Sequence, residues 1–184
     1  GVIERGQNRL AQLRLEQPIC VWLGDRVVIR NWQETATLAG GLVLDVGGDR
    51  KKMRAPARMQ LLEARIAAPK DPQTWVETQL TRDGIAERDT LLRPSFFSPA
   101  EIDKAVTGLL DSRKALQAGD WIADKSRWQS TIAAMSQRVE AEHVRRPELP
   151  GLSLDQLHPV MAQGFPGHDV FSELIADLCR NGFI

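Results

Sequence analysis

The sequence has few of the features that mark membrane, secreted or metal-binding proteins. No apolar run approaches the roughly 18–20 residues that a membrane-spanning helix requires. The first residues lack a basic start followed by an apolar core, so we expect no secretory signal. Only two cysteines occur, Cys20 and Cys179, and neither has a partner at the spacing of a zinc site. We therefore predict two buried thiols in a reducing, cytoplasmic setting, and no metal site.

The motifs of common catalytic sites are also missing. A phosphate-binding loop requires GxxxxGK[ST] between a strand and a helix, and no segment has this pattern. The histidines His143, His158 and His168 are not at metal-ligand spacing, and no GxSxG motif supports a serine nucleophile. The sequence therefore predicts a chain that hydrolyses no nucleotide, needs no cofactor of its own and is not an enzyme by itself.

The pair Gly40–Gly41 is the glycine motif that most resembles a phosphate cradle. A strand-like run at residues 42–46 follows it, and no lysine stands where a phosphate-binding loop places one. Glycines between strands typically mark a bulge or a close backbone approach. We therefore expect this pair to serve the backbone of a β-structure.

The N-terminal part of the sequence has the pattern of antiparallel β-structure. Residues 9–15 alternate polar and apolar side chains, and residues 19–23 form a short apolar run. Gly24–Asp25 predicts a turn before the β-branched run at residues 26–30. Together with residues 42–46 these segments give four short strands, typical of part of a barrel or sandwich.

After a glycine-rich basic segment, the hydrophobic period changes from 2 to 3.6. Ser98, Pro99 and Glu101 form a strong helix-start signal, and residues 115–123 predict a hairpin that turns at Gly119–Asp120. Helices are predicted at 59–67, 72–82, 98–110, 124–145, 154–161 and 168–182. A helix, a capped helix and a hairpin outline a winged helix, and the outline begins again in the second half.

The predicted fold class is α+β, a partial antiparallel β-barrel followed by two winged-helix units. Residues 1–48 are predicted to be the end of the barrel, and residues 49–58 a basic linker. Residues 59–123 form the first predicted winged helix and residues 124–184 the second, which stops before its wing.

Charge is unevenly distributed, although the formal net charge is zero. Residues 1–58 hold ten Lys and Arg against six Asp and Glu, whereas residues 59–184 hold fourteen against eighteen. A basic cluster stands at the predicted linker: Arg50, Lys51, Lys52, Arg54 and Arg58. This cluster is either a solvated linker or a non-specific contact to an RNA backbone.

The third helices of the two winged-helix outlines have acidic polar faces. The first outline carries Glu101, Asp103 and Asp111 beside Lys104, and the second carries Asp169, Glu173 and Asp177 at four-residue intervals. Carboxylates at these places would repel a phosphate backbone, which supplies most nucleic-acid affinity. A packing or spacer role is therefore the better interpretation of these helices.

Two stretches carry a resemblance to a known family. VIERGQNRLAQLRLEQPICVWLGDRVVIR followed by TLAGGLVLD resembles the end of the third domain of elongation-factor-Tu-like GTPases. The segment EHVRRPELPGLSLDQL resembles the C-terminal extension of the bacterial selenocysteine-specific elongation factor, with its pattern at His143, Pro147, Pro150, Gly151 and Leu157. The resemblance covers essentially the whole chain.

This resemblance implies a translation function. It implies a fragment without the family's GTPase domain, so GTP and Mg²⁺ belong to a part that is absent here. The implied partners are selenocysteinyl-tRNA, the ribosome and selenoprotein mRNA. No contact with a membrane is expected. In the family the last winged helices bind an mRNA hairpin, which makes the two present here a spacer.

Carried onto this sequence, the family's tRNA-facing loop comprises Arg30, Asn31, Trp32 and Gln33, with Glu34 at its edge. Polar side chains with one aromatic suit contacts to an RNA backbone and stacking on a base. The loop departs from a typical RNA-binding loop because it holds one basic residue.

Two functions of other classes remain open. A winged-helix transcription regulator would contact duplex DNA through Lys104 or Arg113. A protein-interaction module would offer its acidic helix faces to a basic partner such as a ribosomal protein.

Overall fold

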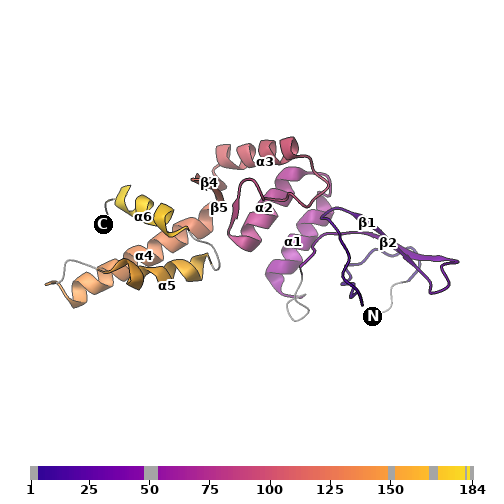
Figure 1. The fold of residues 1–184 in the computed structure, drawn as a ribbon, viewed down its shortest axis with the longest axis horizontal. Helices are drawn as coiled ribbons and strands as arrows, with labels where there is room; N and C mark the ends of the chain where they lie inside the picture. Colours follow the sequence, from indigo (N-terminus) through magenta and orange to yellow (C-terminus); the bar gives the residue numbers. More distant parts are fainter. Residues whose placement is uncertain (1–3, 48–53, 149–151, 166–169, 181, 183–184) are drawn as a thin grey trace. The chain divides into compact units, whose positions relative to one another are not determined.

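The structure is a computed structural model that describes residues 4–47, 54–148, 152–165, 170–180 and 182 (Figure 1). The chain divides into two compact units. The first unit comprises Gly1–Ala67 with Pro94–Phe96, and the second comprises Ala68–Arg93 with Phe97–Ile184. Helices and small antiparallel sheets make a mixed fold, in agreement with the predicted α+β class.

The first unit contains a two-stranded antiparallel ribbon. Strand β1 spans Arg26–Arg30 and strand β2 spans Thr37–Leu42 (Figure 1). Val28 pairs with Gly40, and the register shifts between Ile29 and Arg30. All six residues of β2 are exposed, so the ribbon has no closed core among the described residues.

Sequence patterns found one of the four predicted strands, at residues 26–30. The strand predicted at residues 42–46 shares only Leu42 with β2, and residues 43–46 form no strand. The strands predicted at residues 9–15 and 19–23 are wrong, because the described part of these segments contributes only an isolated bridge at Leu23. Alternation marks a half-buried strand only where a neighbouring strand completes the hydrogen-bond ladder.

The pair Gly40–Gly41 lies inside β2 and presents no phosphate loop, as predicted. We expected this pair to mark a bulge or a close backbone approach, and the bulge is wrong because the irregularity falls at Ile29–Arg30 on the partner strand. A Cβ on Gly41 would lie 3.5 Å from Cγ2 of Val27, which is ordinary contact. The space around Gly41 therefore does not demand a glycine.

Gly24, in contrast, is a position that only glycine can occupy. Its φ is +88°, and a Cβ would lie 1.6 Å from Cδ1 of Phe96. The predicted turn is confirmed, since the N–H of Asp25 donates to the carbonyl of Trp22 at 3.2 Å. The carboxylate of Asp25 in return accepts from the N–H of Trp22 at 2.8 Å.

The segment Pro94–Phe96 returns to the first unit from far along the chain. The N–H of Leu23 donates to the carbonyl of Pro94 at 3.0 Å, and the N–H of Phe96 donates to the carbonyl of Leu23 at 3.0 Å. Leu23 and Ser95 thus form an isolated parallel bridge, and both are buried. No local pattern in the sequence indicates this pairing.

Helix α1, Pro56–Ala67, is held to the segment after β2 by two arginines. Nη1 of the fully buried Arg65 donates to the carbonyl of Leu44 at 2.6 Å. Nη2 of Arg58 lies 2.9 Å from the carboxylate of Asp45, whose side chain is 6% exposed. The predicted helix is confirmed, and it begins three residues early because proline suits the first turn.

The second unit begins with a helix–sheet layer. It contains helix α2 (Pro72–Asp83), strand β3 (Ile85–Glu87), helix α3 (Pro99–Asp111), strand β4 (Ala115–Ala118) and strand β5 (Trp121–Asp124). The sheet order is β3-β5-β4, and both pairs are antiparallel. The predicted hairpin is confirmed, with φ of +58° at Gly119 in its turn. Strand β3 was not predicted, because three residues are too few to show a period.

Both helices of this layer begin at strong side-chain caps. The carboxylate of Asp71 accepts from the hydroxyl and N–H of Thr74, and the hydroxyl contact is the main cause that lowers the pKa of Asp71. The predicted capping box is confirmed at Ser98 and Glu101. The hydrogen bond from the Ser98 hydroxyl lowers the pKa of Glu101 below its usual value.

Three further helices complete the second unit: α4 (Lys125–Arg145), α5 (Leu154–Gly164) and α6 (Phe171–Arg180) (Figure 1). Helix α4 packs against both α5 and α6. A Cβ on Gly164 would lie 2.2 Å from Oγ1 of Thr131, so the glycine allows α5 to approach α4 closely. The predicted helices are confirmed, and α5 runs three residues past its expected end despite Pro159.

The core of the second unit is continuous from the sheet to the last helix. Trp128 and Met135 of α4 pack with Phe165 and Leu174, and the indole of Trp128 lies 5.7 Å from the ring of Phe165. Ile85 and Ala123 of the sheet belong to the same buried cluster. This apolar cluster therefore joins the sheet to helices α4, α5 and α6.

Both cysteines are exposed, so the prediction of buried thiols is wrong. Cys179 follows the fully buried Leu178 on α6 and lies on the solvent side of that helix. Cys20 lies in an extended stretch without a strand partner among the described residues. Apolar neighbours in sequence do not determine on which side of an element a thiol lies.

The Arg58–Asp45 ion pair yields a testable expectation for the first unit. We expect Asp45→Asn to lower the free energy of unfolding by about 1.5–3 kcal/mol, because it weakens a charged hydrogen bond at a nearly buried carboxylate. Urea denaturation measures this change. Arg54→Gln is the matched control, since Arg54 is exposed and forms no ion pair with a described residue. An Asp45→Asn protein as stable as the unaltered chain would contradict a stabilising role for this pair.

Candidate functional site

Residues 30–36, which comprise the last residue of β1 and the loop to β2, are called the ribbon tip and include the predicted tRNA-facing residues. Asn31 organises it. The N–H of Asn31 donates to the carbonyl of Ala36 at 3.0 Å, and Oδ1 of Asn31 accepts from the N–H of Ala36 at 3.0 Å. Its Nδ2 donates to Oγ1 of Thr35 at 2.9 Å. One asparagine therefore closes the loop with both ends of its amide.

Glu34 completes the turn of the ribbon tip. Its N–H donates to the carbonyl of Asn31 at 2.9 Å, and its φ is +56°. A left-handed conformation at a residue other than glycine is uncommon and stores strain. We therefore expect the hydrogen bonds of Asn31 to stabilise this conformation of the turn.

The ribbon tip presents Trp32 to solvent. The Trp32 side chain is 99% exposed, whereas tryptophan is on average a highly buried residue. Arg30 and Gln33 beside it are also exposed, and neither forms an ion pair or hydrogen bond with the side chain of a described residue. A cation, an amide and an aromatic face are thus available together, the set that RNA contacts commonly use.

The structure separates the predicted tip residues into two roles. Arg30, Trp32 and Gln33 are exposed and can touch a partner. Asn31 is half-buried, and its amide is engaged inside the loop. We therefore interpret Asn31 as the residue that positions the tip, a role that the residue pattern alone did not indicate.

The predicted basic cluster is only partly described. Arg50, Lys51 and Lys52 lie outside the described residues. Arg54 is exposed, whereas Arg58 pairs with Asp45 and its side chain is 19% exposed. Arg58 therefore holds helix α1, and an RNA contact through it would compete with that ion pair.

Other kinds of site were sought among the described residues. They contain no group of three His, Cys, Asp or Glu side chains that could hold a metal ion. None of their helices is both long and apolar enough to cross a membrane. The ring of His158 packs 5.4 Å from the ring of Phe171, His143 is exposed, and His168 lies outside the described residues.

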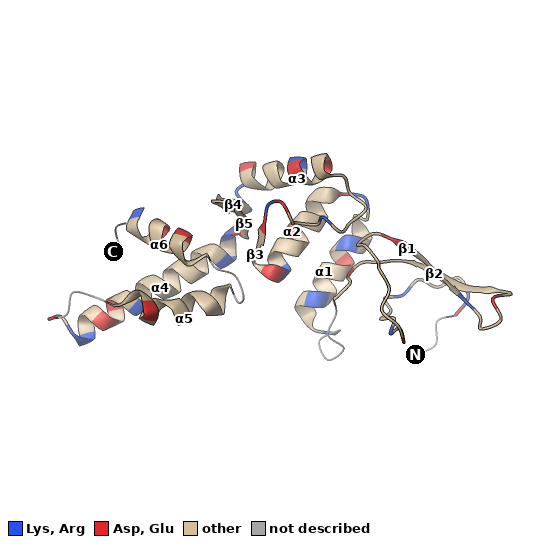
Figure 2. Ribbon diagram, viewed as in Figure 1, with Lys and Arg blue, Asp and Glu red and all other residues tan. Residues whose placement is uncertain are grey.

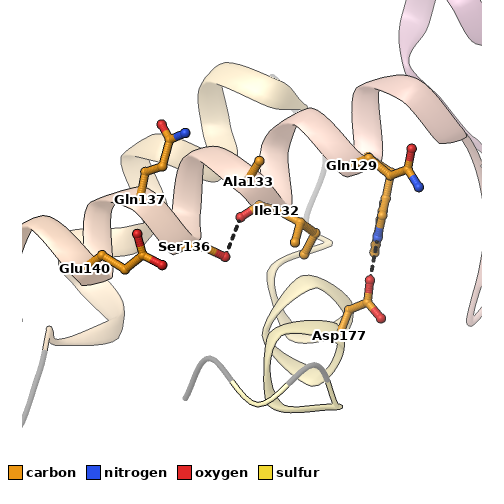
Figure 3. A pocket seen from close by; sticks show the side chains of 8 residues that line it. Gln129, Ile132, Ala133, Ser136, Gln137, Glu140 and Asp177 are labelled. Carbon is orange, nitrogen blue, oxygen red and sulfur yellow. Dashed lines mark hydrogen bonds between the residues drawn. The ribbon is translucent and has the colours of Figure 1, made fainter.

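A shallow hollow of about 530 Å³ lies along α4 and α6 (Figure 3). Its lining is Trp128, Gln129, Ile132, Ala133, Ser136, Gln137, Glu140 and Asp177. The indole N–H of Trp128 donates to Asp177 at 3.0 Å, and the Ser136 hydroxyl donates to the carbonyl of Ile132 at 3.0 Å. The Ser136 hydroxyl is thus directed at its own helix backbone, which does not favour a nucleophilic role.

Figure 2 marks the positions of Asp and Glu along the ribbon in red. The acidic residues of the winged-helix outlines differ in the contacts that their side chains make. Glu101 accepts hydrogen bonds at the start of α3, and Asp177 contacts both Trp128 and Arg180. Asp103 lies 3.7 Å from Arg88 and is largely exposed. Asp169 lies outside the described residues, so the four-residue acidic stripe is described only at Glu173 and Asp177.

Comparison with known proteins connects this architecture to a family. Residues 2–50 match the family model described as the β-barrel domain of the selenocysteine-specific elongation factor. The predicted resemblance to that family is confirmed. Over 176 residues the chain is 20% identical to the selenocysteine-specific elongation factor of Haemophilus influenzae, which covers 94% of this chain. The chain spans 28% of the length of that relative.

The ribbon tip lies inside the matched segment. The match at residues 2–50 therefore places Arg30, Trp32 and Gln33 in a part of the chain that is similar to the β-barrel domain of a selenocysteine-specific factor. The similarity to the curated relative extends through most of the second unit. It gives no role to any single residue.

The role assigned to Asn31 can be tested by amide hydrogen exchange. We expect Asn31→Ala to speed exchange of the Ala36 amide roughly fivefold, which corresponds to a lost hydrogen bond of about 1 kcal/mol. Asn31→Asp keeps the acceptor oxygen and should retain most of the protection. The Val43 amide, bonded to the carbonyl of Asp25 at 2.9 Å at the other end of the ribbon, is the internal reference. Unchanged exchange at Ala36 in Asn31→Ala would show that the backbone alone maintains the loop.

Proposed function

We propose that this chain is a non-catalytic part of a selenocysteine-specific elongation factor. In this proposal the ribbon tip contacts selenocysteinyl-tRNA, and the second unit is a spacer toward the part that binds selenoprotein mRNA on the ribosome. The observation that carries the proposal is the fully exposed Trp32, on a tip closed by Asn31, within the segment that matches the family's β-barrel domain.

The chemistry of the tip supports contact with RNA. An indole face stacks on any base, and such stacking contributes about 1–3 kcal/mol per base. Arg30 lies two residues before Trp32 and supplies a guanidinium for a phosphate, while Gln33 offers a neutral donor and acceptor. A contact of this kind holds an RNA in place without extensive reading of its sequence.

The arrangement of the second unit supports a spacer built from winged helices. The order α2, β3, α3, β4, β5, with β5 between β3 and β4, supports the first proposed winged helix. Helices α4, α5 and α6 support the helical part of the second proposed one. The acidic residues of α3 and α6 oppose a phosphate backbone, and one apolar cluster joins the sheet to α4, α5 and α6.

The tRNA contact is tested by removing the exposed indole. We expect Trp32→Ala to weaken binding of the chain to selenocysteinyl-tRNA roughly 5- to 150-fold, the equivalent of about 1–3 kcal/mol of base stacking. Filter binding or fluorescence anisotropy measures the change. Leu38→Ala removes another exposed apolar side chain from the same ribbon and should change the affinity less than about twofold. Trp32→Phe should keep much of the affinity, and equal binding by Trp32→Ala and the unaltered chain would remove the proposed contact.

The spacer role is tested with the mRNA hairpin of a selenoprotein. We expect the chain to bind this hairpin no more tightly than a hairpin of shuffled sequence, because its third helices present carboxylates. A clear preference for the native hairpin would contradict the spacer role. Preferential binding to a DNA duplex would favour a transcription regulator instead. Capture of a basic ribosomal protein that is lost in Glu173→Gln would favour a protein-interaction module.

A further inference from the structure

A second basic surface lies in the second unit, where the connection from α3 to β4 meets the start of α4. It is a hollow of about 410 Å³. The N–H of Lys125 donates to the carbonyl of Lys114 at 3.2 Å and joins the two elements that form it. The hollow is lined by Glu77, Arg113, Lys114, Asp124, Lys125, Ser126 and Gln129. We call it the α3–α4 groove.

The ion pairs around the α3–α4 groove leave it with uncompensated positive charge. Nζ of Lys114 lies 2.8 Å and 3.0 Å from the two carboxylate oxygens of Glu77, so this pair is neutral. The carboxylate of Asp124 accepts from the N–H of Arg127 at 2.8 Å, caps α4 and keeps its negative charge. The lining holds three cations and two carboxylates, so its net charge is +1. Arg113 and Lys125 form no ion pair with any described residue. Two cations of the lining therefore remain available to a ligand.

The backbone at Arg113 is a second, independent observation. Its φ is +57°, and it follows the end of α3, where its N–H donates to the carbonyl of Leu110 at 3.0 Å. The N–H of Lys114 donates to the carbonyl of Leu109 at 3.0 Å, which completes a helix ending that usually has glycine at this position. Arg113 is exposed, so packing does not account for an arginine in a strained conformation. Strain of this kind concentrates at functional sites.

We propose that the α3–α4 groove binds a phosphate of an RNA backbone. The guanidinium of Arg113 can engage two phosphate oxygens together, and the ammonium of Lys125 adds a point charge. No base-reading arrangement accompanies these cations, so the contact is independent of RNA sequence. The choice of RNA over DNA rests on the proposed function, whereas the affinity for phosphate rests on the groove.

This contact differs from both parts of the proposed function. It does not use the ribbon tip, because it lies in the second unit. It also does not make α3 a reading helix, since Arg113 and Lys125 come from the end of one helix and the start of the next. A spacer with such a groove would be tethered to RNA along its length without choosing an mRNA.

The test uses the full 184-residue chain and a labelled duplex RNA of mixed sequence. We expect Arg113→Gly/Lys125→Gln to weaken binding about tenfold or more at low salt. Each lost phosphate contact should also reduce the slope of log affinity against log salt by about 0.9, so the double variant should lose about 2. Lys70→Gln/Arg145→Gln removes the same charge from two exposed cations that form no ion pair with a residue that the structure describes, and is the matched control.

The single variant Arg113→Gly separates function from stability. Glycine relieves the positive φ, so the midpoint of thermal unfolding should rise while RNA affinity falls. A fall in affinity with a rise in stability cannot come from misfolding. If the lysine–arginine control loses as much affinity and slope as the groove variant, or if the chain binds no duplex RNA at low salt, the proposal is overturned.

Two further arms identify the ligand. If duplex DNA binds as tightly as duplex RNA and the groove variant weakens both equally, the choice of RNA is overturned. If polyglutamate displaces the labelled RNA better than unlabelled RNA does, an acidic protein replaces RNA as the ligand. Trp32→Ala alters the ribbon tip and keeps both groove cations, so its effect is measured with selenocysteinyl-tRNA, whereas the groove variant is measured with duplex RNA. Failure of the tRNA contact and failure of the groove therefore appear in different variants and with different ligands.

Discussion

The second unit depends on strand β5, which pairs with β3 on one side and β4 on the other and then leads directly into α4. Ile122 and Ala123 in this strand have no exposed surface, and Asp124 at its end caps α4. A polar residue at Ala123 would face the buried cluster that contains Ile85 and Trp128. The strand thus joins the two helical layers through both its ladder and its side chains.

The two units are stabilised by different kinds of contact. The second unit closes an apolar core, which gives a body suited to hold two ends of a molecule at a fixed separation. The first unit has an open ribbon, and its ordered features are polar: Asn31 at the tip, Arg58 and Arg65 on α1. Directional contacts of this kind position an exposed surface without burying it. This difference agrees with a contact role for the ribbon and a distance-setting role for the second unit.

Sequence patterns predicted the helices well because the backbone hydrogen bonds of a helix form within one segment. The hydrophobic period and the capping residues are therefore visible in that segment of the sequence. Ser98 with Glu101 is such a local signal, and it is present in the structure as expected. Strands need partners, which is why residues 9–15 were wrongly predicted and β3 was not found. The tip could be located only through the family resemblance. The division of its residues into Trp32, which is exposed, and Asn31, which holds the loop, required hydrogen bonds between positions that no pattern links.

Charge composition is a poor guide to the cations that can meet RNA, because pairing decides their availability. Arg58 counts toward the basic excess of the first 58 residues, yet it pairs with Asp45 of the chain itself. The second part has an acidic excess, but Arg113 and Lys125 have no ion pair among the described residues. A phosphate is attracted mainly by unpaired charges within about a Debye length, roughly 8 Å at physiological salt. The net charge of the whole chain has little effect on it. The more acidic part of this chain can therefore contain a phosphate site, while part of its basic cluster is structural.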